Sequence, residues 1–124
     1  MSSELERIAR LAACFAGDVE GVRVGIGDDA AVLEPVASPI VWTIDAQVEG
    51  THWRREWVSW HDVGWRSFMA AASDLAAMGA SPGVALSSLV LSGDTDDGAL
   101  DALARGQAEA ARAIGSAIVG GNLA

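Results

Sequence analysis

The sequence predicts an α+β domain in which helices cover one face of a mixed or antiparallel sheet. Three observations predict this class: helical spacing of apolar residues in three segments, β-branched or apolar runs between them, and glycine or proline near most junctions. The chain has 124 residues, and 51% of them are apolar. That length suits one domain with one modest core, so we expect residues 1–124 to form a single domain.

The first half of the chain predicts one helix followed by three strands. The helix is expected at Ser3–Ala16, with Ser2 or Ser3 as its cap and Gly17 after its end. The strands are expected at Val22–Gly25, Ala30–Leu33 and Ile40–Ala46. A proline-containing turn at Glu34–Pro39 and a loop at Gln47–Ser59 separate these elements.

The second half predicts helix, strand, helix and strand. A helix is expected at His61–Met78, because Ser59 and Asp62 resemble a capping box and glycine and proline follow its end. The later elements are a strand at Gly83–Leu91, a turn at Ser92–Asp96, a helix at Asp97–Ile114 and a strand at Ala117–Val119. The last strand runs into Gly120–Gly121–Asn122, which is most simply a loop.

Charge and cysteine content exclude several classes of function. The net charge of -9, from 17 acidic and 8 basic residues, argues against nucleic acid and against an anionic membrane as partners. A phosphate ligand remains compatible if metal cations bridge it to the protein. Cys14 is the only cysteine, which excludes an internal disulfide or a cysteine-based zinc site. With no transmembrane-length run and no signal peptide, we expect a cytoplasmic protein.

Acidic residues stand at unusual places in three expected elements. Asp28 and Asp29 follow a glycine turn, Asp45 ends a β-branched run, and Asp74 lies within the apolar segment MAAASDLAAMGA. Each has a simpler explanation: an Asx-type turn, a strand-end charge, and a carboxylate on a solvent-facing helix surface. We favour the last of these least, because apolar residues flank Asp74 on nearly every side. Carboxylates gathered within reach of one another repel unless cations lie among them, so the set suggests a Mg²⁺ site for phosphoryl transfer.

Other candidate residues carry weaker signals. Asn122, after two glycines, offers a side-chain oxygen to a metal near a phosphate, although a plain turn explains the triplet more simply. His52 lies in a loop, where it is either solvated or in contact with a substrate, and His61 suits a cap or the surface. The chain contains no GxxxxGK[ST] loop and no Ser/His/Asp or Cys/His set, so nucleophilic catalysis has no support.

Four segments carry a resemblance to a known family. GIGDDAAVL, TIDAQVEGTHW, SDLAAMGASP and IVGGN resemble, in order and spacing, the N-terminal half of the thiamine-monophosphate kinases. These kinases share a superfamily with aminoimidazole-ribonucleotide synthetase, selenophosphate synthetase and the hydrogenase-maturation carbamoyl dehydratase. The resemblance spans essentially the whole chain and implies the N-terminal domain of the aminoimidazole-ribonucleotide synthetase-like fold.

The resemblance also implies a reaction and its site residues. Such enzymes transfer the γ-phosphoryl group of ATP to thiamine monophosphate by direct in-line attack, and several Mg²⁺ ions take part. The matching positions imply metal contacts from Asp28, Asp29, Thr43, Ile44, Asp45, Asp74 and Asn122. They imply ATP contacts from Gly121 and Asn122 and a thiamine monophosphate contact from His52. The family also implies a homodimer paired across a sheet edge, with the tryptophan-rich stretch Trp53–Trp65 as a candidate for that contact or for a pocket wall.

The chain departs from the family pattern at three points. Ile44 replaces a hydroxyl residue, which leaves only its backbone carbonyl as a ligand, and Asn122 stands where many members have Asp. Family members are well over twice this length, so we expect a fragment that is inactive without a C-terminal domain. Two alternatives are a catalytically silent dimerisation module and another superfamily enzyme such as selenophosphate synthetase. The position of Cys14 within a helix counts against the latter.

Overall fold

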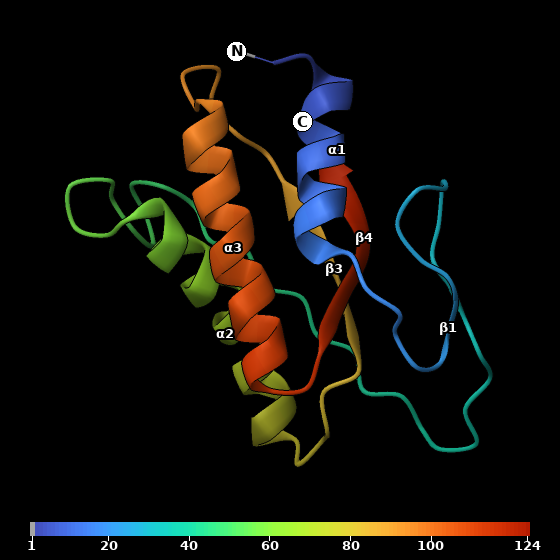
Figure 1. The fold of residues 1–124 in the computed structure, drawn as a ribbon. Coiled ribbons are helices and arrows are strands. Elements are labelled where there is room, and N and C mark those ends of the chain that lie inside the picture. Colours follow the sequence, from blue (N-terminus) through green and yellow to red (C-terminus); the bar gives the residue numbers. More distant parts are fainter. Residues whose placement is uncertain (1) are drawn as a thin grey trace.

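A computed structural model describes residues 2–124 and contains three helices and four strands (Figure 1). In chain order they are α1 (Glu4–Phe15), β1 (Val22–Val24), β2 (Val32–Leu33), α2 (Trp60–Ala77), β3 (Val84–Leu89), α3 (Asp97–Ala113) and β4 (Ala117–Leu123). The α+β class is therefore confirmed. Within the described residues, no helix is long and apolar enough to cross a membrane.

Each helix begins at a side chain that accepts a hydrogen bond from the first turn. Ser3 caps α1 in a capping box with Glu6, as the backbone N–H of Ser3 donates to Glu6 Oε2 at 2.7 Å. The backbone N–H of Asp62 donates to Ser59 Oγ at 3.1 Å at the start of α2. Asp96 accepts from the backbone N–H of Ala99 at 2.7 Å at the start of α3. These contacts satisfy backbone donors that have no partner within the helix, so the expected helix starts hold to within one residue.

The core lies where α2 and α3 pack against each other and against β3. Its central apolar cluster consists of Trp53, Val63, Leu89, Leu100 and Leu103, and Ile118 and Val119 of β4 are also buried. Glycines allow the close approach of the two helices, since a Cβ on Gly64 would lie 2.0 Å from the carbonyl oxygen of Leu103. A Cβ on Gly106 would likewise lie 2.0 Å from the carbonyl oxygen of His61. The two backbones thus touch where neither helix carries a side chain.

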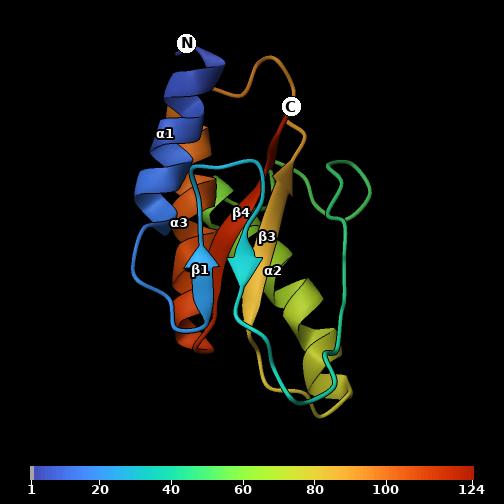
Figure 2. The ribbon, with the colours of Figure 1, turned by 90° about the vertical axis from the view of Figure 1, so that its right-hand side faces the viewer.

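The strands form two separate pairs, and the expectation of one sheet is wrong. β1 and β2 pair antiparallel, whereas β3 and β4 pair parallel. Figure 2 shows the β1–β2 hairpin in front, β3 and β4 further back with α1 beside them, and α2 and α3 behind. The helices therefore cover one face of the β3–β4 pair, as expected, and α1 and α3 both contact β4.

The segment expected as a strand at Ile40–Ala46 is irregular in the structure, so this prediction is wrong. None of its backbone groups makes a backbone hydrogen bond within residues 2–124, and Ile44 is 93% exposed. β-branched residues favour strands because they pack on a pleated, partly buried surface. No neighbouring strand offers that surface here, so the composition alone does not produce a strand.

Candidate functional site

The predicted acidic pair lies in the turn between β1 and β2. The backbone N–H of Asp29 donates to Asp28 Oδ1 at 2.8 Å, and both side chains are exposed. Gly27 has a φ of 123°, a conformation that L side chains rarely adopt, so glycine allows the chain to turn there. Arg23 closes the base of the hairpin through two hydrogen bonds to Glu34, at 2.9 and 2.7 Å. The pair is therefore presented to solvent on a short, braced hairpin.

Asp74 lies in the last turns of α2, and its position corrects one expectation. The solvent-facing position that the sequence disfavoured is the observed one, because Asp74 is exposed. Its Oδ2 accepts a hydrogen bond from Thr43 Oγ1 at 3.1 Å, which brings two predicted metal-site residues together. Ile44 and Asp45, the next two predicted residues, are both exposed. The structure thus joins the 43–45 segment to α2 at Asp74.

The setting of Asp74 suits a cation. A helix carries partial negative charge at its C-terminal end, and α2 has no basic residue in its last turn. A carboxylate there is repelled by the helix and is not stabilised by an arginine. Among residues 2–124, none of Asp28, Asp29, Asp45 and Asp74 takes part in an ion pair. This chemistry fits Mg²⁺, which prefers oxygen ligands with negative charge.

Gly121 and Asn122 lie inside β4 rather than in a loop, so the expectation that the strand ends at Val119 is wrong. They pair with Ser87 and Ser88 of β3. A Cβ on Gly121 would lie 1.8 Å from the carbonyl oxygen of Ser87, so glycine is required for this close pairing. The identity of Gly121 therefore has a structural reason, and its contact with ATP stays a prediction. Asn122 is exposed on the strand.

His52 lies on a tight turn that fixes its ring. The backbone N–H of Val48 donates to His52 Nδ1 at 2.9 Å, and the backbone N–H of His52 donates to the carbonyl of Val48 at 2.8 Å. Gly50 closes the turn by donating to the carbonyl of Trp53 at 2.8 Å. An Nδ1 that accepts a hydrogen bond leaves the ring proton of neutral histidine on Nε2. His52 is exposed, so it presents a donor to solvent.

Two of the predicted regions lie apart in the single chain. Figure 1 shows the loop between residues 48 and 58 on the left of the molecule and the β1–β2 hairpin on the right. Within residues 2–124, no three His, Cys, Asp or Glu side chains gather closely enough to hold a metal ion. Thr43 and Asp74 are joined by a hydrogen bond although they belong to separate segments. The complete magnesium site therefore stays a prediction.

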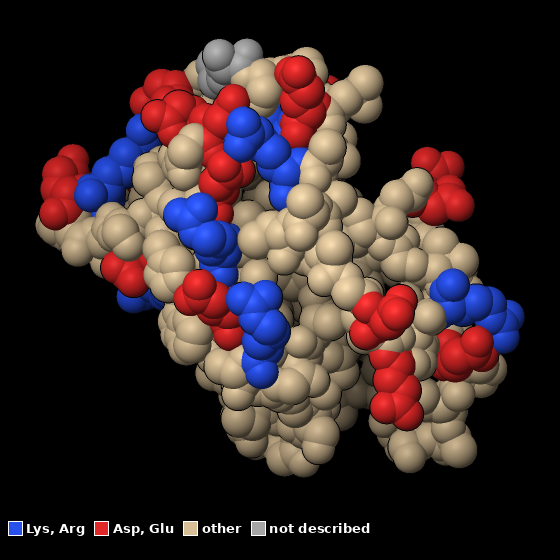
Figure 3. Space-filling view, viewed as in Figure 1, with Lys and Arg blue, Asp and Glu red and all other residues tan. Residues whose placement is uncertain are grey.

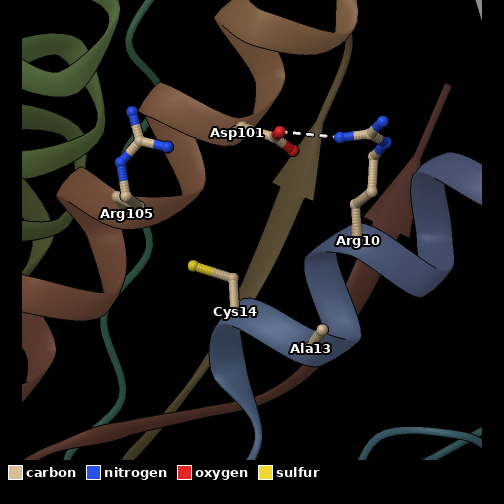
Figure 4. Close-up of a pocket in the computed structure, with 5 residues that line it drawn as sticks. All are labelled: Arg10, Ala13, Cys14, Asp101 and Arg105. Carbon is tan, nitrogen blue, oxygen red and sulfur yellow. Dashed lines mark hydrogen bonds and ion pairs between the residues drawn. The ribbon is translucent and has the colours of Figure 1, made fainter.

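An open surface pocket of about 350 Å³ lies elsewhere, between α1 and α3 (Figure 4). Its lining consists of Arg10, Ala13, Cys14, Asp101 and Arg105, none of which is a predicted site residue. Arg10 Nη1 is 2.7 Å from Asp101 Oδ2, so these two charges satisfy each other. Burial raises the pKa of the Cys14 thiol, which favours the unreactive form. Cys14 thus behaves as a packing residue, in line with its helical position.

Charge is distributed unevenly over the surface. Four of the eight basic residues lie on α1 and α3, and Figure 3 shows basic side chains gathered over these helices. Arg7 and Arg10 on α1 pair with Asp97 and Asp101 on α3. These arginines join the two helices.

One ionic cluster was missed by the sequence analysis. Arg55 contacts Glu49 in the His52 turn and Asp94 in the loop before α3. Arg55 and Asp94 are 39 residues apart, so no local spacing connects them. The loop expected at Gln47–Ser59 is therefore fixed more firmly than its lack of periodicity suggested.

Comparison with known proteins identifies the class of the domain. Residues 27–124 match the family model described as AIR synthase related protein, N-terminal domain. The chain belongs to this family, and the resemblance and fold inferred from the sequence are confirmed.

The individual proteins that the chain resembles are thiamine-monophosphate kinases. The chain is 36% identical over 111 residues to a thiamine-monophosphate kinase of Rhodopirellula baltica, an alignment covering 82% of this chain and 35% of that protein. It is 34% identical over 102 residues to the Mycobacterium tuberculosis enzyme of the same name, covering 82% of this chain and 31% of the relative. The crystal structure of thiamine-monophosphate kinase from Stenotrophomonas maltophilia K279a matches with a TM-score of 0.73 and 28% identity. That match covers 97% of this chain and 37% of the solved chain. The chain thus spans about a third of the length of the relatives it matches.

Proposed function

We propose that this chain is the metal- and nucleotide-binding domain of a kinase that phosphorylates thiamine monophosphate to thiamine diphosphate with ATP. The observation that carries the proposal is the match of 97% of the chain to the fold of a thiamine-monophosphate kinase. The acidic residues expected from the sequence are exposed and outside ion pairs, which supports their use by an external cation.

The residues divide into three roles in this proposal. The carboxylates of Asp28, Asp29, Asp45 and Asp74 hold Mg²⁺, with further oxygens from Thr43, Ile44 and Asn122. Gly121 and Asn122 contact ATP. His52 donates its Nε2 proton to an oxygen of thiamine monophosphate. Bound Mg²⁺ supplies neutralisation of the charge on the transferred phosphoryl group.

A second copy of the chain completes the proposed assembly. β3 and β4 form a parallel pair, and parallel sheets occur almost only with both faces covered. Here the helices cover one face, while Leu86 and Val90 on and just after β3 are 65% and 81% exposed. Apolar exposure of this kind marks an interaction surface. We therefore propose a homodimer that covers this face; the sequence resemblance also implies a homodimer, but one paired across a sheet edge.

Isothermal titration of the chain with Mg²⁺ and a non-hydrolysable ATP analogue tests the proposal. We expect nucleotide binding that requires Mg²⁺. The Asp74→Asn substitution should weaken Mg²⁺ binding by at least about tenfold, since it removes a charged oxygen from the ion's surroundings. Asp18→Asn is the matched control, because it removes the same charge from an exposed position outside the acidic motifs.

Two results would contradict parts of this proposal. Absence of Mg²⁺-dependent nucleotide binding by the chain would favour the catalytically silent dimerisation module. An equal loss of affinity in Asp18→Asn and Asp74→Asn would indicate a general charge effect, which removes Asp74 from the set of ligands.

A further inference from the structure

Arg55 occupies the centre of the ionic cluster beside the His52 turn. Its Nε and Nη2 donate to the two carboxylate oxygens of Glu49 at 2.8 and 3.0 Å. Its Nη1 donates to Asp94 Oδ2 at 2.9 Å, and its Nη2 donates to Ser92 Oγ at 2.8 Å. A planar guanidinium that meets a carboxylate through two parallel bonds fixes direction as well as distance.

The cluster joins three separate segments of the chain. Glu49 belongs to the turn that carries His52, and Asp94 belongs to the loop that leads into α3. The Arg55 guanidinium also lies over the ring of Trp60, at 5.3 Å from its centroid, at the start of α2. The hydrogen bonds to Glu49 and Asp94 raise the pKa of Arg55, and Arg55 lowers the pKa of Asp94 to about 2. Arg55 and Asp94 therefore stay ionised near neutral pH.

Apolar packing of Trp53 also holds the turn, but it does not fix the orientation of the turn. Trp53 is 8% exposed and packs edge-on against Trp60, with ring centroids 5.4 Å apart. Its buried indole Nε1 has no hydrogen-bond partner within residues 2–124. Trp53 thus anchors the turn by apolar packing, which is not directional. Arg55 supplies the polar contacts between the turn and the helical layer.

We propose that Arg55 is a positioning residue that holds the 48–53 turn so that His52 Nε2 stays a fixed donor for a phosphate monoester. The inference rests on the proposed function for the identity of that ligand, but the bracing of the turn is a property of the chain alone. Arg55 acts through Glu49, because Glu49 directly follows Val48, whose backbone N–H donates to His52 Nδ1.

Nuclear magnetic resonance of the ¹⁵N-labelled chain tests the bracing. The Val48 N–H···Nδ1 bond to His52 joins two nitrogens, so a scalar coupling across it is directly observable. Arg55→Ala should abolish this coupling and speed amide exchange at Val48 by at least about tenfold. Arg55→Lys should rescue it only in part, because an ammonium group cannot contact Glu49 and Asp94 with the geometry of a guanidinium.

A control variant and a control amide distinguish a local effect of Arg55 on the turn from a general loss of stability. Arg54→Ala is the matched control, since Arg54 lies over the exposed Trp57 at 5.3 Å and does not join the cluster. The amide of Leu100, in the buried part of α3, reports the stability of the core. A coupling that survives Arg55→Ala would overturn the proposal, as would equal acceleration of exchange at Val48 and Leu100.

Titration with thiamine monophosphate tests the consequence for the ligand. His52→Ala and Arg55→Ala should each raise its Kd by about tenfold, and the double variant should raise it no further, because both act on one donor. Additive losses would overturn the assignment of Arg55 as acting through His52. If the wild-type chain binds no thiamine monophosphate while the coupling responds as expected, the ligand of the proposed function is wrong and the bracing by Arg55 stands.

Discussion

At the scale of single residues, His61 shows how one contact between helices acquires a pH dependence. Its Nε2 lies 2.8 Å from Glu109 Oε2, which joins the start of α2 to α3, and its Nδ1 lies 3.6 Å from Asp62. The hydrogen bond to Glu109 raises the pKa of His61 above its ordinary value of 6.5, against a smaller opposing effect of burial. The sequence predicted only a cap or surface residue, since Glu109 is 48 residues away.

The raised pKa of His61 predicts the direction of a stability change. A group with a higher pKa in the folded state stabilises the fold fully below its unfolded pKa, and this contribution is lost as the pH rises through the folded pKa. The free energy of unfolding should therefore fall between about pH 6 and pH 8 more in the wild type than in Glu109→Gln. Urea unfolding at both pH values measures this, with Glu20→Gln as an exposed control. Identical pH dependence in wild type and Glu109→Gln would contradict the role of the pair.

At the scale of elements, the sequence predicted what depends on neighbours along the chain. The starts of α2 and α3 follow from Ser59 and Asp96, because a cap acts within one turn. The strand expected at Ile40–Ala46 failed because a strand needs a partner that no local pattern supplies. The prediction that Asp74 does not face solvent was wrong for the same reason. An apolar surround in sequence does not show which side of a helix another element covers.

The crossing of α2 and α3 provides a test of packing at this scale. Alanine favours a helix over glycine by about 1 kcal/mol, so propensity alone would make Gly106→Ala stabilising. The added Cβ would lie 2.0 Å from the carbonyl oxygen of His61, and overpacking costs about 1–3 kcal/mol. We expect the clash to prevail and the free energy of unfolding to fall. Urea denaturation followed by circular dichroism measures it.

A matched glycine outside the crossing serves as the control for this packing test. Gly83→Ala adds the same methyl group where no heavy atom lies within 4 Å. If both substitutions change the free energy of unfolding equally, close helix packing does not explain Gly106.

At the scale of the whole molecule, several large apolar side chains remain exposed on the surface of the single chain. The tryptophans of the stretch Trp53–Trp65 differ in burial: Trp53 is buried in the core, and Trp57 is exposed on the surface. The outer face of the β3–β4 pair exposes Leu86 and Val90. The acidic motifs and His52 were readable from sequence because they are short motifs. Which of them lie close together was not readable, because that depends on contacts between distant segments, such as the hydrogen bond from Thr43 to Asp74.

The uncovered sheet face predicts the association state. If a second copy covers it, the chain should sediment as a dimer at micromolar concentration, because burying several large apolar side chains favours association. The double substitution Leu86→Lys and Val90→Lys should give a monomer with unchanged helix content, since both side chains point away from the core. Leu5→Lys is the control, since Leu5 is equally apolar and is exposed on α1, away from β3. A wild-type chain that sediments as a monomer would contradict the homodimer.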